Sequence, residues 1–413
     1  MSASPDGAPG TTTVRTKVTS WVLRIPPAWS SVAVLVAFLW ILWTQPVTSL
    51  QIDSLVYRYG AEVLFSGTDR LYEQPDGALP FTYPPVAALF FTPLLVAEPL
   101  AALIVIVAGL ASVWRMTWLV LDYLRPEEHG HAMAAAALLP LAVLTEPIFK
   151  TFSYGQINLV LAWLVTEDLL GRHRGRFGGI LVGLATLIKL TPAAFFLIIV
   201  LRRDVASFLR GIGTIIAGVV LGFLLMPSSS RIFWSGLTGA AQRVGDVAYF
   251  LNQSTKGAFA RSGITASWPW ILACLLILAA TCLAAHLLLR SGRDLPAVLV
   301  TAFCALLISP VSWSHHWVWT WPLMLWAVID HRPPLGKGLL FLGFSWAFAV
   351  LVRPFWWAIP HHGPWHEVSW WQLVISDTYM VVGAFTLVML TVEAFRLRAQ
   401  GTAIGPGQVV GTE

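Results

Sequence analysis

The sequence predicts an all-α, polytopic membrane protein with about twelve transmembrane helices and long extracytoplasmic loops. Of its 413 residues 57% are apolar, whereas only 26 are Lys or Arg and 21 are Asp or Glu. A helix needs about 20 apolar residues to cross a bilayer, and a charged fraction of 11% is well below the ~25% of soluble domains. This composition excludes a soluble globular enzyme, a disordered chain and a nucleic-acid-binding protein.

Apolar runs bounded by charged residues, Pro and Gly predict the individual crossings. They lie near 32–45, 99–124, 132–147, 156–170, 177–190, 192–201, 211–226, 268–290, 295–309, 316–329, 338–352 and 372–395. The segment 84–97 is also apolar, but four prolines interrupt it. We interpret it as a re-entrant or broken piece before the second crossing, because irregular backbone at membrane depth must be surrounded by protein or line a cavity. The alternative is a thirteenth span.

The distribution of basic residues favours twelve crossings. With the N-terminus in the cytoplasm, most Lys and Arg residues fall on the cytoplasmic side, as the positive-inside rule requires. A thirteenth span would invert every later loop and remove this agreement. The predicted organisation is a disordered cytoplasmic tail (1–28), a single transmembrane domain (29–396) and a second cytoplasmic tail (397–413).

We expect this protein to lie in the plasma membrane. The polar residues that do not set its orientation in the membrane gather on the predicted outer side. Three long loops, 46–83, 227–267 and 353–371, carry most of them. A polar cluster confined to one face of the membrane predicts that the working site is extracytoplasmic.

Asp53 follows the first apolar run by a few residues. It precedes a predicted amphipathic helix over 54–65 that ends before Gly67. Two interpretations remain open at this point. Asp53 could cap the N-terminus of that helix, or it could act beside an outer cavity as a general base that takes a proton from a hydroxyl.

The run Ser309–Trp317 carries two adjacent histidines, His315 and His316, at the outer end of the ninth predicted span. Ionisable residues at membrane depth are costly and indicate function by default. They do not form a recognisable metal pair, because helical ligand pairs sit four residues apart and no third ligand is identifiable. Hydrogen bonding to a phosphate or sugar hydroxyl and simple interfacial packing both remain open.

Other polar residues recur at the predicted outer ends of spans. Lys189, just before Pro192, is an intramembrane cation that either binds a partner or extends to the interface. The arginines of the outer loops could pair with phosphate or contact lipid headgroups. The further candidates are Arg58, Tyr83, Gln156, Asn158, Asn252, Gln253 and Arg353.

The order of these motifs resembles a known family. The motifs, in order along the chain, are Asp53 in a long first outer loop, Tyr83-Pro84-Pro85, Gly155-Gln156-x-Asn158, Lys189-x-x-Pro192, Asn252-Gln253-Ser254 and the run ending in His315-His316. It is similar to C-type glycosyltransferases, and more narrowly to the actinobacterial branch of polyprenol-phosphate-mannose-dependent α-mannosyltransferases. The resemblance covers about residues 30–395.

The resemblance implies a polyprenyl-phosphate-mannose donor and a mannosylated lipid acceptor of the phosphatidylinositol mannoside type, extended through an α-1,2 linkage with inversion. Asp53 would be the catalytic base. His315 or His316, with Lys189 or an outer Arg, would stabilise the departing phosphate, and the further candidates above would bind substrate. Many related enzymes carry a second acidic residue where this chain has Ser54, so no metal and no cofactor are expected.

A flippase or transporter of a lipid-linked sugar is the main alternative. It would predict internal repeats and charged residues at mid-span, and neither is evident in the sequence. A non-catalytic membrane scaffold would leave the one-sided polar cluster unexplained. The sequence therefore favours an enzyme.

Overall fold

The computed structural model describes residues 24–45, 47–73, 79–172, 174–236, 245–330, 336–358 and 368–403. Within these ranges the regular structure is helical, and the one β-contact is an isolated antiparallel bridge between Asn252 and Trp313. The predicted all-α class is confirmed for this part of the chain. Most of both predicted tails, 1–23 and 404–413, and parts of the predicted outer loops lie outside the described residues.

Five helices among the described residues are long and apolar enough to cross a membrane. They are α2 (Pro27–Thr44), α5 (Glu98–Leu124), α13 (Val205–Leu225), α16 (Ser267–Arg290) and α22 (Thr378–Ala403). Leu224 of α13 and Leu276 of α16 are 75% and 63% exposed, as side chains facing lipid would be. The chain is a membrane protein by this measure.

The predicted number of twelve crossings is not confirmed. Several predicted spans are short or broken helices, because Pro, Gly or a polar residue interrupts the apolar run. Residues 131–154 form α6 (His131–Ala137), α7 (Leu139–Leu144) and α8 (Glu146–Tyr154), with a bend of 79° before α8. At most this bent group would add a sixth span.

The predicted spans 177–190 and 192–201 are the clearest case of shortening. They become α11 (Ile180–Ile188), η2 (Thr191–Phe195) and α12 (Phe196–Leu201), separated by Lys189 and Leu190. Nine residues of α-helix rise about 14 Å, whereas the hydrocarbon core is ~30 Å thick. The break therefore places the Lys189 backbone at a junction between two short helices.

The first outer segment forms α3 (Ile52–Ser66), α4 (Ala87–Phe90) and η1 (Thr92–Leu95). The residue that precedes α3 is Gln51, and Asp53 lies inside the first turn, so the N-cap interpretation of Asp53 is wrong. Gly67 ends α3 in the left-handed conformation, as expected. Residues 84–97 form two short helices and no continuous helix of span length.

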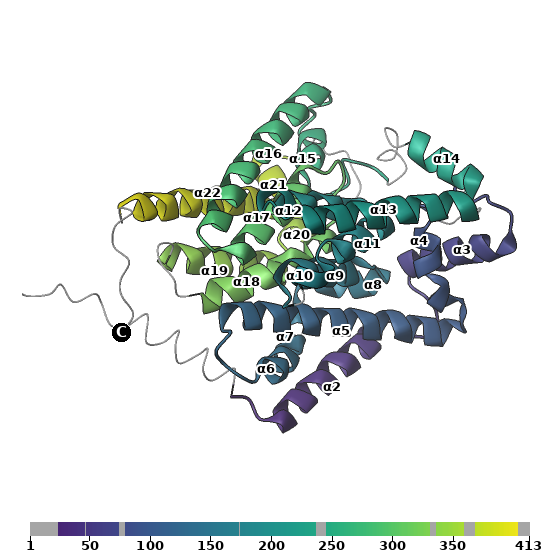
Figure 1. Ribbon diagram of the computed structural model, residues 1–413, viewed down its shortest axis with the longest axis horizontal. Coiled ribbons are helices and arrows are strands. Elements are labelled where there is room, and N and C mark those ends of the chain that lie inside the picture. The colour runs from purple at the N-terminus through teal and green to yellow at the C-terminus, as the bar shows by residue number, and fades with distance from the viewer. Residues whose placement is uncertain are drawn as a thin grey trace, which may run out of the picture.

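Helix α5 runs through the middle of the molecule and organises its first half (Figure 1). On one side it contacts α6 and α7, against which α2 packs. On the other side it contacts α9 (Asn158–Leu170) and α18 (Thr320–Ile329). Helix α13 packs on α11 and continues through Met226 into α14 (Pro227–Ser235), while α10 (Arg174–Phe177) connects α9 to α11.

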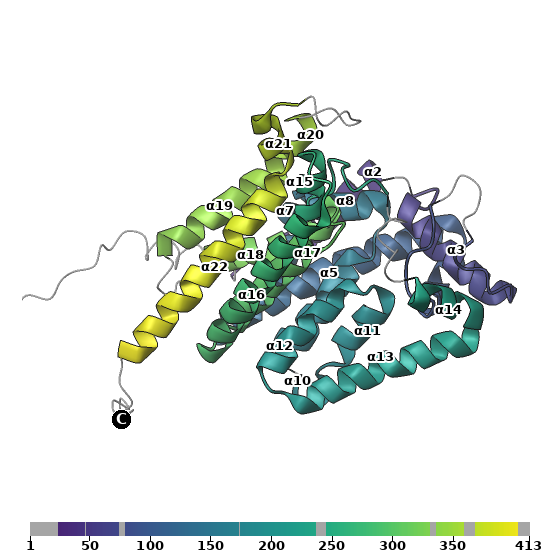
Figure 2. The same ribbon diagram turned by 90° about the horizontal axis from the view of Figure 1, so that it is seen from above.

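The second half is a group of helices that run side by side in Figure 2. It consists of α16, α17 (Asp294–Ile308), α19 (Gly336–Val352) and α22. Buried aromatic rings fill the space between them, with Trp317 and Trp346 ring centres 5.6 Å apart and Tyr379 5.7 Å from Trp346. This packing gives the segments that carry Trp317 and Tyr379 a rigid support.

Short helices connect the long ones at the end of the molecule that carries the polar candidates. They are α8, α15 (Thr255–Arg261), η4 (Ser314–Trp319), α20 (Phe355–Ala358) and α21 (Trp370–Ser376). A buried ion pair between Arg261 and Asp377 ties α15 to the start of α22. Helix α8 lies against η4, which brings residues near 150 beside residues near 315.

Candidate active site

Asp53 is held at the corner between α8 and α9. The hydroxyl of its neighbour Ser54 donates a hydrogen bond of 2.8 Å to the Gly155 carbonyl oxygen. Gly155 has φ +66°, and a Cβ at this position would lie 2.1 Å from Ser54 Oγ. Only glycine allows this approach, so the first turn of α3 sits directly against the segment that leads into α9.

Gln156 links Asp53 to two buried tyrosines. The Tyr57 hydroxyl donates to Gln156 Oε1 at 3.0 Å and lies 3.2 Å from the Tyr83 hydroxyl. Because the amide oxygen accepts from Tyr57, the amide nitrogen of Gln156 remains to donate to the Asp53 carboxylate. Gln156 and Tyr83 were predicted from the sequence to bind substrate, whereas Tyr57, which lies one helical turn after Asp53 on α3, was not.

The partly buried position of Asp53 changes its acidity. Burial raises the pKa of its carboxyl to about 6, although the hydrogen bond from Gln156 and the charge of Lys189 act in the opposite direction. A carboxylate with this pKa is a better proton acceptor near neutral pH than an exposed aspartate. The site therefore contains one acid group suited to general-base chemistry.

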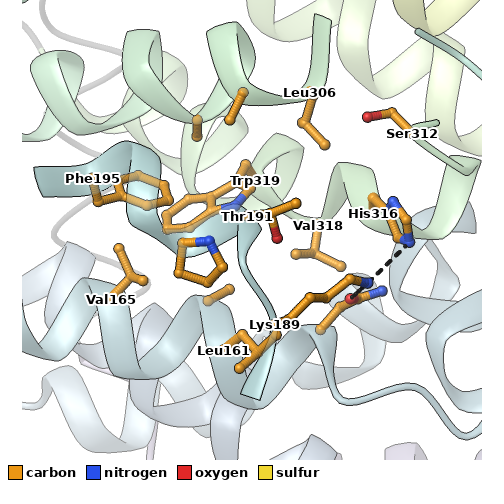
Figure 3. Close-up of a pocket in the computed structure, with 15 residues that line it drawn as sticks. Leu161, Val165, Lys189, Thr191, Phe195, Leu306, Ser312, His316, Val318 and Trp319 are labelled. Carbon is orange, nitrogen blue, oxygen red and sulfur yellow. Dashed lines mark hydrogen bonds between the residues drawn. The ribbon is translucent and has the colours of Figure 1, made fainter. Parts of the chain in front are cut away.

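Lys189 lines a pocket together with His316 (Figure 3). Its backbone is extended between α11 and η2, and its Nζ donates to Asn158 Oδ1 at 3.2 Å. Nζ also lies 3.3 Å from His316 Nε2. A protonated amine can only donate, so this contact makes His316 Nε2 the acceptor and places the imidazole proton on Nδ1. His316 thus orients Lys189.

His315 is placed differently from its neighbour. Its backbone oxygen accepts hydrogen bonds of 3.2 Å from Thr151 Oγ1 and from Asn158 Nδ2. Its ring is 5% exposed, lies edge-on to Tyr154 with 5.0 Å between ring centres, and forms no hydrogen bond with the described residues. The sequence could not separate the roles of the two histidines; the structure gives only His316 a hydrogen bond with Lys189.

A cavity of about 60 Å³ begins at Lys189 and His316 (Figure 3). Asn158 and Ser312 add polar groups at this end, and apart from Thr191 the remaining wall is apolar. Phe195 and Trp319 close that wall with ring centres 5.0 Å apart. At ~30 Å³ for one water molecule, the cavity has room for about two water molecules, and not for a complete glycolipid.

Asn252 and Gln253 do not join this cluster through their side chains. Asn252 Nδ2 donates to the carbonyl oxygens of Val247 and Pro310, at 2.9 and 3.1 Å. Gln253 Nε2 donates to those of Phe250 and Ser376, at 2.8 and 2.7 Å. Both residues are 0% exposed. Their contacts hold the loop before α15 against the strand-like segment before η4.

The two predicted arginines, Arg58 and Arg353, contact residues other than Asp53. Arg58 pairs with Glu62 at 2.9 Å and donates to the Val96 carbonyl oxygen at 2.9 Å. Arg353 lies between α19 and α20, near Phe149 of α8. Among the described residues, His, Cys, Asp and Glu side chains do not gather in groups of three that could hold a metal ion.

This part of the chain thus combines long apolar helices with a carboxyl of raised pKa, a buried lysine and a small cavity. Residues 81–310 match the model of Glycosyltransferase family 87, and the chain belongs to that family. It is therefore a glycosyltransferase.

Curated relatives cover most of the chain. A polyprenol-phosphate-mannose-dependent alpha-(1-2)-phosphatidylinositol mannoside mannosyltransferase of Mycolicibacterium smegmatis is 36% identical over 72% of this chain and 74% of its own. The Mycobacterium tuberculosis protein of the same description is 33% identical over 84% and 86%. A Mycolicibacterium smegmatis pentamannoside mannosyltransferase of this type is 32% identical over 92% and 93%. No solved structure matches the chain.

Proposed function

We propose that this protein transfers mannose from polyprenyl-phosphate-mannose to a mannosylated phosphatidylinositol lipid, through an α-1,2 linkage and with inversion, on the outer face of the plasma membrane. The relatives described above carry this donor, acceptor class and linkage in their names. The observation that carries the proposal is that Asp53 of α3 and Lys189 of the α11–η2 break lie within electrostatic range of each other.

Asp53 performs the proton transfer. As the acceptor hydroxyl oxygen attacks the anomeric carbon of mannose, its proton passes to the Asp53 carboxylate. Gln156 holds that carboxylate in place, and its own amide is fixed by Tyr57. A base positioned in this way contributes about 10²–10⁴-fold to the rate. Because attack and departure occur on opposite faces of the sugar, one carboxylate suffices and no covalent intermediate forms.

Lys189 stabilises the leaving group. The bond between the anomeric carbon and the phosphate oxygen breaks, and its electron pair stays on the phosphate. A preorganised cation in a site that excludes water interacts strongly with such a developing charge. Asn158 and His316 hold the Lys189 ammonium, and the apolar wall formed by Phe195 and Trp319 suits the first isoprenoid carbons of the donor.

The central test is transfer by the purified protein in lipid nanodiscs, with polyprenyl-phosphate-mannose and phosphatidylinositol mannoside. The wild type should form a glycolipid with one more mannose. Asp53→Asn should lower turnover by about 10²-fold or more, whereas Asp246→Asn, which removes the same charge from an exposed loop residue, should not. Retained turnover in the Asp53 variant would reject the base assignment. Donor movement across the bilayer without transfer would favour a flippase.

The orientation is tested separately with cysteines at the two ends of α16. Ser262 and Ser291 are exposed and flank this helix, whereas the native Cys304 is buried. In intact cells a membrane-impermeant maleimide should label Ser262→Cys, and it should label Ser291→Cys only after permeabilisation. The reverse pattern would place the site in the cytoplasm and refute the proposed location.

A further inference from the structure

A pair of cations, Lys150 and Arg353, lies near His315 in addition to Lys189. Lys150 of α8 places its Nζ 4.5 Å from the Trp356 ring centre and 5.5 Å from that of Tyr154. Among the described residues it forms no hydrogen bond and no ion pair. Arg353 Nε is likewise buried and without a hydrogen bond in this part of the chain. The Lys150 and Arg353 charges are close enough to repel one another.

Among the residues that the structure describes, one acidic side chain, Glu146, lies within electrostatic range of this pair, and it is already engaged. Glu146 is 0% exposed, and its two carboxylate oxygens accept from Ser314 Oγ at 2.7 Å and from the Tyr379 hydroxyl at 3.0 Å. It lies within electrostatic range of both Lys150 and Arg353. Two cations and one carboxylate leave an excess positive charge, which a bound anion would neutralise.

The backbone of Arg353 supports a binding role. It has φ +58°, a left-handed conformation that is unfavourable for a residue with a Cβ, and it precedes Pro354. Strained conformations of this kind concentrate at functional sites, where the surrounding structure maintains them. Here the strain places a guanidinium beside α8.

His315 lies near both cation sites. Both of its ring nitrogens are buried and without hydrogen bonds among the described residues, and it lies within electrostatic range of Lys150 and of Lys189. Tyr154, one helical turn after Lys150, packs edge-on against it. Gln156, the partner of Asp53, follows two residues later. The α8–α9 corner therefore connects Lys150 directly to the partner of the base.

We propose that Lys150 and Arg353 bind the phosphodiester of the lipid acceptor and that His315 contributes a hydrogen bond from the same side. This inference rests on the proposed function and adds a position for the acceptor. The donor phosphate occupies the Lys189 site, which has the apolar wall for an isoprenoid chain. The acceptor phosphate occupies the second site, where the Trp356 ring offers a flat surface for an adjoining sugar.

The test compares two acceptors in the same nanodisc assay, phosphatidylinositol mannoside and an uncharged alkyl mannoside. Lys150→Gln and Arg353→Gln should each raise KM for the phosphorylated acceptor about tenfold, the loss expected for one hydrogen bond to a charged group. KM for the alkyl mannoside and for the donor should stay unchanged. Arg353→Lys should recover part of the affinity. The matched control is Lys256→Gln, which removes a cation that lies over Trp270.

Each outcome has a definite meaning. Transfer to the alkyl mannoside at the wild-type rate shows that a variant is folded, so a selective rise in KM for the phosphorylated acceptor supports the site. A rise in donor KM would assign these cations to the donor phosphate and overturn the proposal, as would an equal effect on both acceptors or no effect on either. Absence of any transfer by the wild type would overturn the proposed function and this site with it.

Discussion

Ser54 Oγ and the Gly155 carbonyl oxygen are joined by a hydrogen bond of 2.8 Å that ties the first turn of α3 to the corner between α8 and α9. The two residues are about a hundred positions apart in the sequence. Their contact places Asp53 beside Gln156 and makes the geometry of the base depend on one glycine. The contact is therefore a sensitive point at which to test the site.

Gly155→Ala should destabilise the protein and disturb the position of Asp53. A Cβ at Gly155 would lie 2.1 Å from Ser54 Oγ, and its φ of +66° is unfavourable for alanine. We expect a loss of about 2 kcal/mol or more, seen as a lower midpoint of thermal unfolding together with reduced turnover. The control is Gly213→Ala in α13, where a Cβ would meet open space; it should be neutral or slightly stabilising. Equal behaviour of the two variants would contradict the close approach.

Lys189 and His316 should act as one unit. Lys189→Ala should lower kcat/KM by about 10²–10³-fold, because the cation opposite the departing phosphate is lost. His316→Ala should cost less, since it removes only the acceptor that orients Nζ. The double variant should resemble Lys189→Ala alone, because residues in one network are not additive. A double-mutant cycle of kcat/KM measures this coupling, and additive effects would show that the histidine acts independently of the lysine.

The acceptor kcat/KM should depend on pH through Asp53. Burial raises the pKa of Asp53 to about 6, and a general base must be deprotonated, so activity should fall about tenfold per pH unit below 6 and level off above it. The Lys189 charge lowers that pKa, so Lys189→Gln should move the acidic limb to higher pH. A profile without change between pH 5 and 7 would argue against Asp53 as the base.

Gln253 should prove to be a structural residue. Its amide nitrogen donates to the carbonyl oxygens of Phe250 and Ser376, and its Oε1 accepts from the Tyr379 backbone nitrogen at 3.0 Å. Gln253→Ala removes these three hydrogen bonds to buried backbone groups and should cost on the order of 3 kcal/mol. Thermal unfolding should therefore shift down while KM for both substrates stays near the wild-type value. The opposite result, with a raised KM and unchanged stability, would restore the substrate-binding interpretation.

The number of membrane crossings could not be predicted from the apolar runs alone. Apolar runs correctly predicted α2, α5, α13, α16 and α22, because a long uninterrupted run can satisfy its backbone in lipid only as a helix. They did not show that the run on either side of Lys189 would become helices of nine and eleven residues. Whether a break divides one apolar run into two crossings or bends it within the protein depends on what surrounds it.

Within the site, the sequence likewise could not predict which residues surround Asp53 and Asn252. Position alone left Asp53 as a cap or a base; the structure places it inside α3, next to a glutamine from another element. Asn252 looked equally available for substrate, yet its amide group binds backbone and is fully buried. Residue type and motif order do not encode which polar side chains meet each other.

By itself the sequence determined that this is an all-helical membrane protein of a lipid-dependent glycosyltransferase type, because composition and the order of motifs along the chain suffice for that conclusion. Only the tertiary structure decided that Gln156 and Tyr57 support Asp53, that His316 holds Lys189, and that Lys150 and Arg353 lie within electrostatic range of each other. These relationships join residues from separate helices, and the packing of side chains between helices decides which of them come into contact.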